Sequence, residues 1–253
     1  MSPTEIALIV FACVFGGTLL GMFLRVVMPE HHLSDDSKDV IKLGMGLIAT
    51  IAALVLGLVI ATAKTSFDTQ DAAVKHTAVK IILLDRVLAQ YGPETKETRD
   101  LIRLTLAHKV DEIWPEERSQ PERLDTPKAA PAGEKIGDRI RQLTPQNDAQ
   151  RGLQSRALQI ADDIMETRWF MFGGMGSSVP APFLVVVAFW LTFIFGCFGI
   201  FAPRNATVVA VLFICALSIA GSIFLILEMD RPFSGVIKIS SSPLRYTLSH
   251  LGQ

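Results

Sequence analysis

The chain has 253 residues, of which 50% are hydrophobic and 19% are charged, and its formal net charge is −1. Its mean hydropathy of +0.39 is too high for an ordinary water-soluble domain of this length. The balanced charge also excludes the strongly basic surface that is typical of nucleic-acid-binding proteins. Composition therefore predicts an integral membrane protein.

Four apolar runs are each long enough to cross a hydrocarbon core about 30 Å thick. They occupy residues 6–27, 41–63, 183–201 and 206–227. They predict an all-α membrane protein with four transmembrane helices and a helical cytoplasmic insert. We divide the chain into a first transmembrane hairpin (1–63), a cytoplasmic helical domain (64–182), a second transmembrane hairpin (183–229) and a cytoplasmic C-terminal strap (230–253).

The orientation follows from the basic residues near the span ends, which favour the cytoplasmic side. Four spans place both termini and the long insert on one face, where the nearby basic residues are Lys64, Lys75, Arg168, Arg231, Lys238 and Arg245. The opposite face carries Arg25, Lys38, Lys42 and Arg204 together with several acidic residues. This modest bias predicts that both termini lie in the cytoplasm and that the protein spans the plasma membrane.

The second membrane helix is expected to continue beyond the membrane. No glycine or proline follows Ala63 until Gly92, and apolar residues recur at helical spacing over this stretch. Gly92 and Pro93 should end that helix and start another at about 94–114. A proline-rich, mobile linker is predicted at 115–145 with a short helical piece near 134–143, followed by a helix at about 146–172 that Thr144 or Asn147 could cap.

The stretch LEMDRPFSG at 227–235 marks the end of the fourth span. Its structural residues are Glu228, Asp230, Arg231, Pro232 and Phe233. Pro232 cannot donate the next helical hydrogen bond, so the helix should stop there. One interpretation is a stop signal followed by a docked strap. The other is that the three charged residues form ion pairs with the cytoplasmic helices or line an ion vestibule.

The second span has two distinct faces. Small residues occupy one of them, namely Gly46, Ala49, Ala53, Gly57 and Ala61. The opposite face presents Ile51, Val55, Leu58 and Thr62 at spacings of three and four. Several copies around an axis would bring this bulky face together as an apolar neck, which can gate by dewetting. The alternative is that the bulky face meets lipid or the other spans.

Hydroxyl and charged residues follow the predicted neck. Ser66 and Thr69 would line a wet vestibule, and Lys64 and Asp68 could tune ion entry there. The alternative for the charged residues is an ordinary solvated helix face with pairs at helical spacing. The opposite signs leave anion and cation selectivity open.

Three stretches resemble the bestrophin-like family of bacterial and plant membrane proteins. They are LEMDRPFSGVIKISSSPLR at 227–245, LDRVLAQYGPE at 84–94 and GLVIATAKTSFD at 57–68. The resemblance covers nearly the whole chain and implies two helices, a cytoplasmic helical insert and two more helices in a bacterial inner membrane. The family name also implies kinship with bestrophins, which are pentameric ion channels with four membrane helices in each subunit. The chain lacks their Asn-Ile-Pro-x-x-Phe neck element and their calcium clasp.

Together these features predict a homo-oligomeric, pentameric ion channel that conducts passively. The alternative is a non-conducting scaffold whose cytoplasmic helices bind a protein partner. The expected partners are further copies of the chain, membrane lipid and inorganic ions, and nucleic acid is not among them. The sequence shows no catalytic constellation, phosphate-binding loop or paired metal-ligand spacing, so we expect neither an enzyme nor a bound cofactor or metal.

Overall fold

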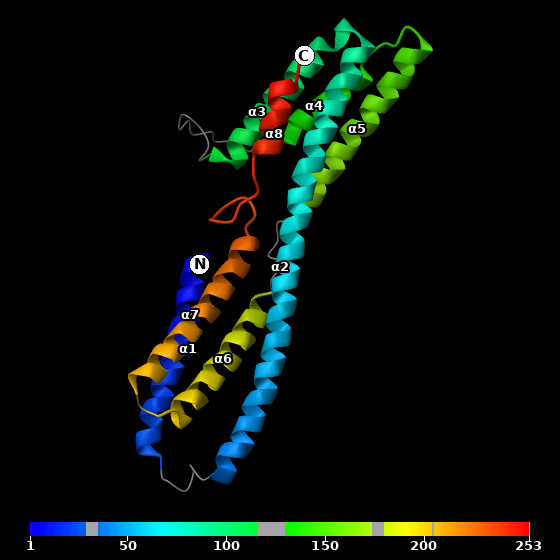
Figure 1. Cartoon of the computed structure of the whole chain (residues 1–253). Helices are drawn as coiled ribbons and strands as arrows, with labels where there is room; N and C mark the ends of the chain where they lie inside the picture. Colours follow the sequence, from blue (N-terminus) through cyan, green and yellow to red (C-terminus); the bar gives the residue numbers. More distant parts are fainter. Residues whose placement is uncertain (29–34, 116–129, 174–179, 204, 253) are drawn as a thin grey trace. The chain divides into compact units, whose positions relative to one another are not determined.

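The computed structural model describes residues 1–28, 35–115, 130–173, 180–203 and 205–252. These residues form eight α-helices and one short 3-10 helix and contain no strand (Figure 1). Four of the described helices are long and apolar enough to cross a membrane: α1 (Pro3–Val27), α2 (Asp35–Tyr91), α6 (Ala181–Phe201) and α7 (Ala206–Met229). The predicted fold class, an all-α membrane protein with four transmembrane helices, is confirmed.

The chain divides into two compact units. The first consists of Met1–Phe67 and Ser177–Ile237, and the second of Asp68–Gly176 and Lys238–Gln253. Helix α2 contributes residues to both units, because its 57 residues run without a break from Asp35 to Tyr91. The predicted continuation of the second span as one helix is therefore confirmed.

Helices α1 and α6 of the first unit are packed backbone to backbone. A Cβ atom on Gly21 would overlap the carbonyl oxygen of Gly196, and one on Gly199 would overlap that of Thr18. Small residues allow this close approach, which compensates in lipid for the missing hydrophobic driving force between helices. Helix α7 joins them through a buried cluster of Val10, Val14, Ile194, Phe195, Ala216 and Ile223.

In the second unit, α2 ends in a tight turn. Gly92 has φ 144°, a conformation that glycine adopts readily, and Pro93 opens the 3-10 helix η2 (Pro93–Thr95) that leads into α3 (Lys96–Ile113). The Thr95 hydroxyl lies 2.6 Å from the carbonyl oxygen of Leu88 and 2.9 Å from that of Gly92. The predicted end of α2 at Tyr91-Gly92-Pro93 is confirmed.

The remaining helices of the second unit are α4 (Ala130–Arg141), α5 (Asp148–Gly173) and α8 (Ser242–His250). Of the predicted linker at 115–145, residues 116–129 lie outside the described part, and α4 overlaps the helical piece predicted near 134–143. The Gln154 side chain donates hydrogen bonds to the carbonyl oxygens of Ile140 and Leu143, both at 2.9 Å, and so fastens the end of α4 to α5. Asn147 caps α5 by accepting a hydrogen bond from the Gln150 amide at 2.8 Å.

Candidate functional site

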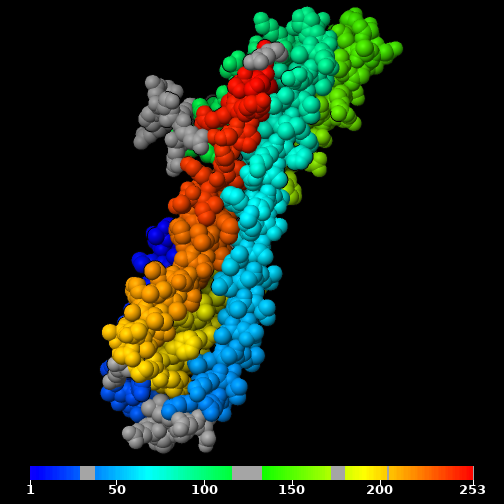
Figure 2. Space-filling view, in the orientation of Figure 1, coloured from blue at the N-terminus to red at the C-terminus, as the bar shows by residue number. Residues whose placement is uncertain are grey.

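The outer face of α2 in the first unit is uncharged and open. Leu58 and Thr62 are exposed, and so is Ile51, which lies two turns before Leu58. The Thr62 hydroxyl donates a hydrogen bond of 2.9 Å to the carbonyl oxygen of Leu58 within the same helix. The Thr62 hydroxyl therefore already has a hydrogen-bond partner within α2. This face could therefore border either lipid or a narrow water path without leaving an unpaired group. Figure 2 shows the α2 residues before position 67 as a blue band.

Val55, the remaining predicted neck residue, lies closer to the interior of the unit. It is half-buried and packs against a cluster of Val59, Ala63 and Ile226, which joins α2 to α7. Val59 and Ala63 occupy the stripe of α2 that faces its own chain. Of the four predicted neck residues, Val55 thus sits at the edge of the packed stripe, while Ile51, Leu58 and Thr62 are exposed.

An open hollow of about 410 Å³ lies directly beyond Leu58 on the same helix. It is lined by Ala61, Thr62, Thr65 and Ser66. Two of these, Thr62 and Ser66, belong to the predicted neck and vestibule. The other predicted vestibule residues, Lys64, Asp68 and Thr69, are exposed on α2. The structure thus places an aliphatic stretch and an open hollow bordered by threonine, serine and alanine residues in sequence along one helix.

The small face of α2 is also exposed. A Cβ atom added to Gly46 or Gly57 would find nothing within 4 Å, in contrast to the crowded glycines between α1 and α6. Small side chains that already have a neighbour in this chain bring backbones together. Gly46 and Gly57 of α2 meet no such neighbour among the described residues.

Glu228 is a buried carboxylate at the end of α7. Its Oε2 accepts hydrogen bonds from the backbone amides of Val236, at 2.5 Å, and Ile237, at 3.5 Å. Gly235 makes this loop possible, since its φ is 99° and a Cβ atom there would overlap the Glu228 carboxylate. The loop thus folds back so that two amides satisfy a carboxylate that is only 4% exposed.

The neighbouring residues of the LEMDRPFSG stretch close this turn. The Arg231 Nη2 atom donates a hydrogen bond of 2.9 Å to the carbonyl oxygen of Met1, which ties the end of α7 to the start of α1. Pro232 is buried, while Phe233 and Asp230 are half-buried. For Glu228, the alternatives from sequence were an ion pair, a vestibule and a docked strap; its hydrogen bonds go to the backbone of the following tail.

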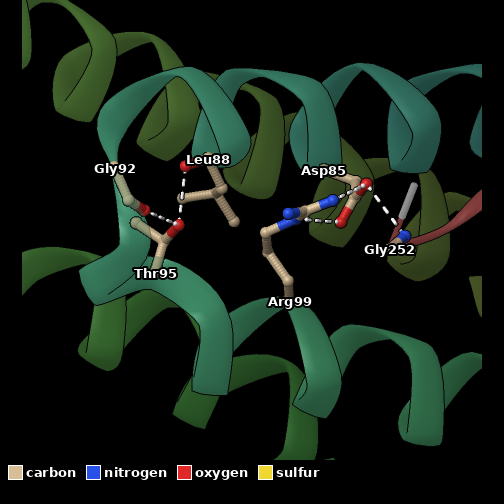
Figure 3. Close-up of polar contacts among 6 residues, drawn as sticks. All are labelled: Asp85, Leu88, Gly92, Thr95, Arg99 and Gly252. Atoms are coloured by element: carbon tan, nitrogen blue, oxygen red, sulfur yellow. Dashed lines mark hydrogen bonds and ion pairs between the residues drawn. The ribbon is translucent and has the colours of Figure 1, made fainter.

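A second polar centre, in the second unit, went unrecognised in the sequence (Figure 3). Arg99 of α3 donates two hydrogen bonds to Asp85 of α2, Nε to Oδ1 at 2.7 Å and Nη2 to Oδ2 at 2.9 Å. The backbone amide of Gly252 adds a third at 3.3 Å to Oδ2. The hydrogen bond to Asp85 raises the pKa of the Arg99 guanidinium above its ordinary value. The centre joins α2, α3 and the residues after α8.

The C-terminal tail has two further anchors within the second unit. The buried Trp114 indole donates a hydrogen bond of 2.8 Å to the carbonyl oxygen of Ile239. The Thr247 hydroxyl of α8, also buried, lies 3.2 Å from the carbonyl oxygen of Ala78 on α2. The tail is therefore an integral part of this unit, and α8 is a helix where the sequence indicated only a strap.

Comparison with known proteins connects these features to a family. The family model for the bestrophin-like domain matches residues 12–244. The chain belongs to the bestrophin-like family. The resemblance stated from the sequence is confirmed. Neither the curated proteins nor the solved structures gave a match.

The bestrophin-like match includes all four apolar helices except the first residues of α1. It also includes the Asp85–Arg99 pair and the Glu228–Ile237 loop, and it ends at Leu244, inside α8. Family and apolar helices together make this a membrane protein related to ion channels. Among the described residues, no group of three or more His, Cys, Asp or Glu side chains is arranged to hold a metal ion.

Proposed function

We propose that this bestrophin-like protein is a homo-oligomeric ion channel, a pentamer in a bacterial inner membrane with both termini in the cytoplasm. Four spans from one chain enclose too little space for a water-filled path, so a pore requires several copies around an axis. Membership of a family related to ion channels supports this proposal, as do the four apolar helices.

The observation that carries the proposal is the order of side chains along the open face of α2. Ile51 and Leu58 come first, with Val55 at their inner edge, and Thr62 then borders the open hollow that it lines together with Ala61, Thr65 and Ser66. The change from aliphatic to hydroxyl side chains begins at Thr62, inside the apolar run that ends at Ala63, and continues into the part of α2 beyond that run. In a ring of α2 helices, the same order gives an apolar neck that leads into a wet vestibule.

The proposal assigns no ion selectivity. Lys64 and Asp68 follow the neck with opposite charges, and Ser66 and Thr69 offer hydroxyl groups that can face ions of either sign. Conduction would be passive, because the proposed path contains only a constriction and a hydrated entrance. Gating would come from wetting and drying of the aliphatic neck.

Currents across planar lipid bilayers test the proposal. Purified wild-type protein should give unitary currents, and Leu58→Ala should increase the leak because it shortens an aliphatic side chain in the neck. Leu20→Ala on α1 is the matched control, since Leu58 is 63% exposed and Leu20 58% exposed in the chain. The control should leave the currents unchanged. Absence of flux at every voltage and pH, together with a stoichiometric co-purifying protein, would instead favour a non-conducting scaffold.

A further inference from the structure

The chain after α7 is held at two points that lie very close together in the sequence. In the first unit, the buried Glu228 carboxylate accepts hydrogen bonds from the backbone amides of Val236 and Ile237. In the second unit, the buried Trp114 indole donates a hydrogen bond of 2.8 Å to the carbonyl oxygen of Ile239. One residue separates the two anchors, so the Cα atoms of Ile237 and Ile239 lie at most about 7 Å apart. A segment this short has almost no slack.

The anchor in the second unit is held firmly. Ile239 is itself buried, and the chain that follows it stays docked in the same unit. The Thr247 hydroxyl lies 3.2 Å from the carbonyl oxygen of Ala78, and the Gly252 amide donates a hydrogen bond to Asp85. Several buried contacts of the second unit therefore fix the position of Ile239.

The anchor in the first unit lies next to a contact between α7 and α2. Ile226, two residues before Glu228, is buried and packs with Val59 and Ala63 of α2. Val55, the inner residue of the proposed neck, packs against the same cluster. Displacement of the last turn of α7 would therefore change a contact of the helix that forms the proposed neck.

Two anchors on one short segment support each other. While Ile239 is held, the amides of Val236 and Ile237 stay close to the Glu228 carboxylate, which raises their effective concentration there. Closure of the loop on Glu228 then costs less conformational entropy than it would with a free tail. By linkage, closure of the loop must favour docking of the tail by the same factor.

We propose that residues 236–239 form a regulatory link through which the second unit controls the end of α7 and, with it, the neck. The hydrogen bond between Trp114 and Ile239 stabilises the closed loop at Glu228. Loss of that bond opens the loop and loosens the packing of α7 against α2. The effect on the neck rests on the proposed function, whereas the coupling between the two anchors does not depend on conduction.

Hydrogen exchange of the Val236 and Ile237 amides in the full-length protein tests the coupling. Trp114→Phe removes an anchor in the second unit, yet it should accelerate exchange of these two amides of the first unit by about fivefold or more. Gln154→Ala is the matched control, because it also removes a side-chain hydrogen bond to a backbone carbonyl of the second unit, 2.9 Å long and made to Ile140. Exchange in the control should match the wild type. Wild-type exchange of the two amides in Trp114→Phe would overturn the inference.

A lengthened segment separates transmission through the chain from a general loss of stability. A flexible Gly-Ser insertion after Lys238 leaves both anchors in place and gives the segment slack. In this background, Trp114→Phe should lose most of its effect on the Val236 and Ile237 amides. Equal acceleration with and without the insertion would show that the effect does not pass through the segment, and would overturn the inference.

Currents across planar bilayers provide the second readout, and the two proposals can then fail separately. Trp114→Phe should change the open probability, whereas Gln154→Ala should leave it at the wild-type value. An unchanged open probability in Trp114→Phe would overturn the control of the neck. Coupled exchange without any wild-type current would refute the channel alone. Currents that respond to Leu58→Ala, with exchange of the Val236 and Ile237 amides unaffected by Trp114→Phe, would refute the link alone.

Discussion

Asp85 and Arg99 face each other across the hairpin of α2 and α3, joined by two hydrogen bonds of 2.7 and 2.9 Å. Each lies seven residues from Gly92, so the turn brings them opposite each other. The Asp85 carboxylate is almost completely buried, and the Gly252 amide is its third donor. A buried carboxylate of this kind is stable only while its donors remain in place.

Removal of one partner of this pair should weaken the second unit. Asp85→Ala leaves Arg99 without its carboxylate, and we expect a loss of about 3–5 kcal/mol in the free energy of unfolding. Asp71→Ala removes the partner of the exposed Lys75 and should cost at most ~1 kcal/mol. Hydrogen–deuterium exchange of residues 78–106 in detergent measures the loss of stability in each of the two variants. Equal protection in the two variants would contradict this account of the pair.

The pH dependence of this pair follows from the raised pKa of Arg99. The pKa of Arg99 is higher in the folded state than in the unfolded chain, so the stabilisation is fully present below the unfolded-state pKa and is lost only as the pH rises through the folded-state pKa. Protection of α3 against hydrogen exchange, after correction for the intrinsic rate, should therefore not fall between pH 7 and pH 10 through deprotonation of Arg99. Arg99→Lys keeps the positive charge but loses the planar guanidinium group that makes two hydrogen bonds to Asp85. This variant should lower that protection at both pH values.

Trp114 fastens the tail through its indole nitrogen. Trp114→Phe keeps most of the apolar volume and removes the hydrogen bond to Ile239, at a cost of about 1–2 kcal/mol. Limited proteolysis should then cut the C-terminal tail faster than in the wild type. Trp169→Phe is the control because Trp169 is 67% exposed. The C-terminal tail of this variant should be cut at the wild-type rate.

The loop after α7 depends on Gly235 and Glu228 together. Gly235→Ala places a Cβ atom against the Glu228 carboxylate in a backbone conformation that alanine avoids, so the loop should open. Exchange of the Val236 and Ile237 amides should accelerate, and Glu228→Ala should have the same effect by removing their acceptor. Val236→Ala keeps the backbone amide and should exchange as the wild type does. Slow exchange in Gly235→Ala would show that the loop does not need this contact.

Close packing between α1 and α6 predicts that alanine substitutions at two glycines of the first unit will have different effects on stability. Gly199→Ala should force the helices apart and lower stability by about 1–3 kcal/mol, because the new methyl group meets backbone atoms of Thr18 and Met22. Gly16→Ala has open space around it and should be neutral or slightly stabilising. Thermal unfolding of the two variants in the same detergent compares them directly.

Local sequence signals were sufficient to predict most of the helices. The apolar runs predicted the four spans, and the absence of glycine and proline between Ala63 and Gly92 predicted the length of α2. The signals for α8 were weaker because it has only nine residues, although Pro243 in its first turn is a typical helix start. Such patterns involve residues that are close together in the sequence, so they can be recognised without knowledge of the fold.

Contacts between elements were harder to predict. The Asp85–Arg99 pair joins residues 14 positions apart, and only their equal distance from Gly92 could have indicated it. The partners of Glu228 are backbone amides, which have no signature in a sequence, and the turn that presents them depends on one glycine at positive φ. Val55 was grouped with the neck by spacing alone, because the packing of α7 against α2 cannot be read from the period of one helix.

A density map of the full-length protein in a lipid nanodisc tests the arrangement of copies most directly. The account predicts a ring of identical chains with α2 nearest the central axis and Leu58 at the narrowest point. A single chain without an axis, or a ring in which α2 lies at the outer rim against lipid, would contradict it.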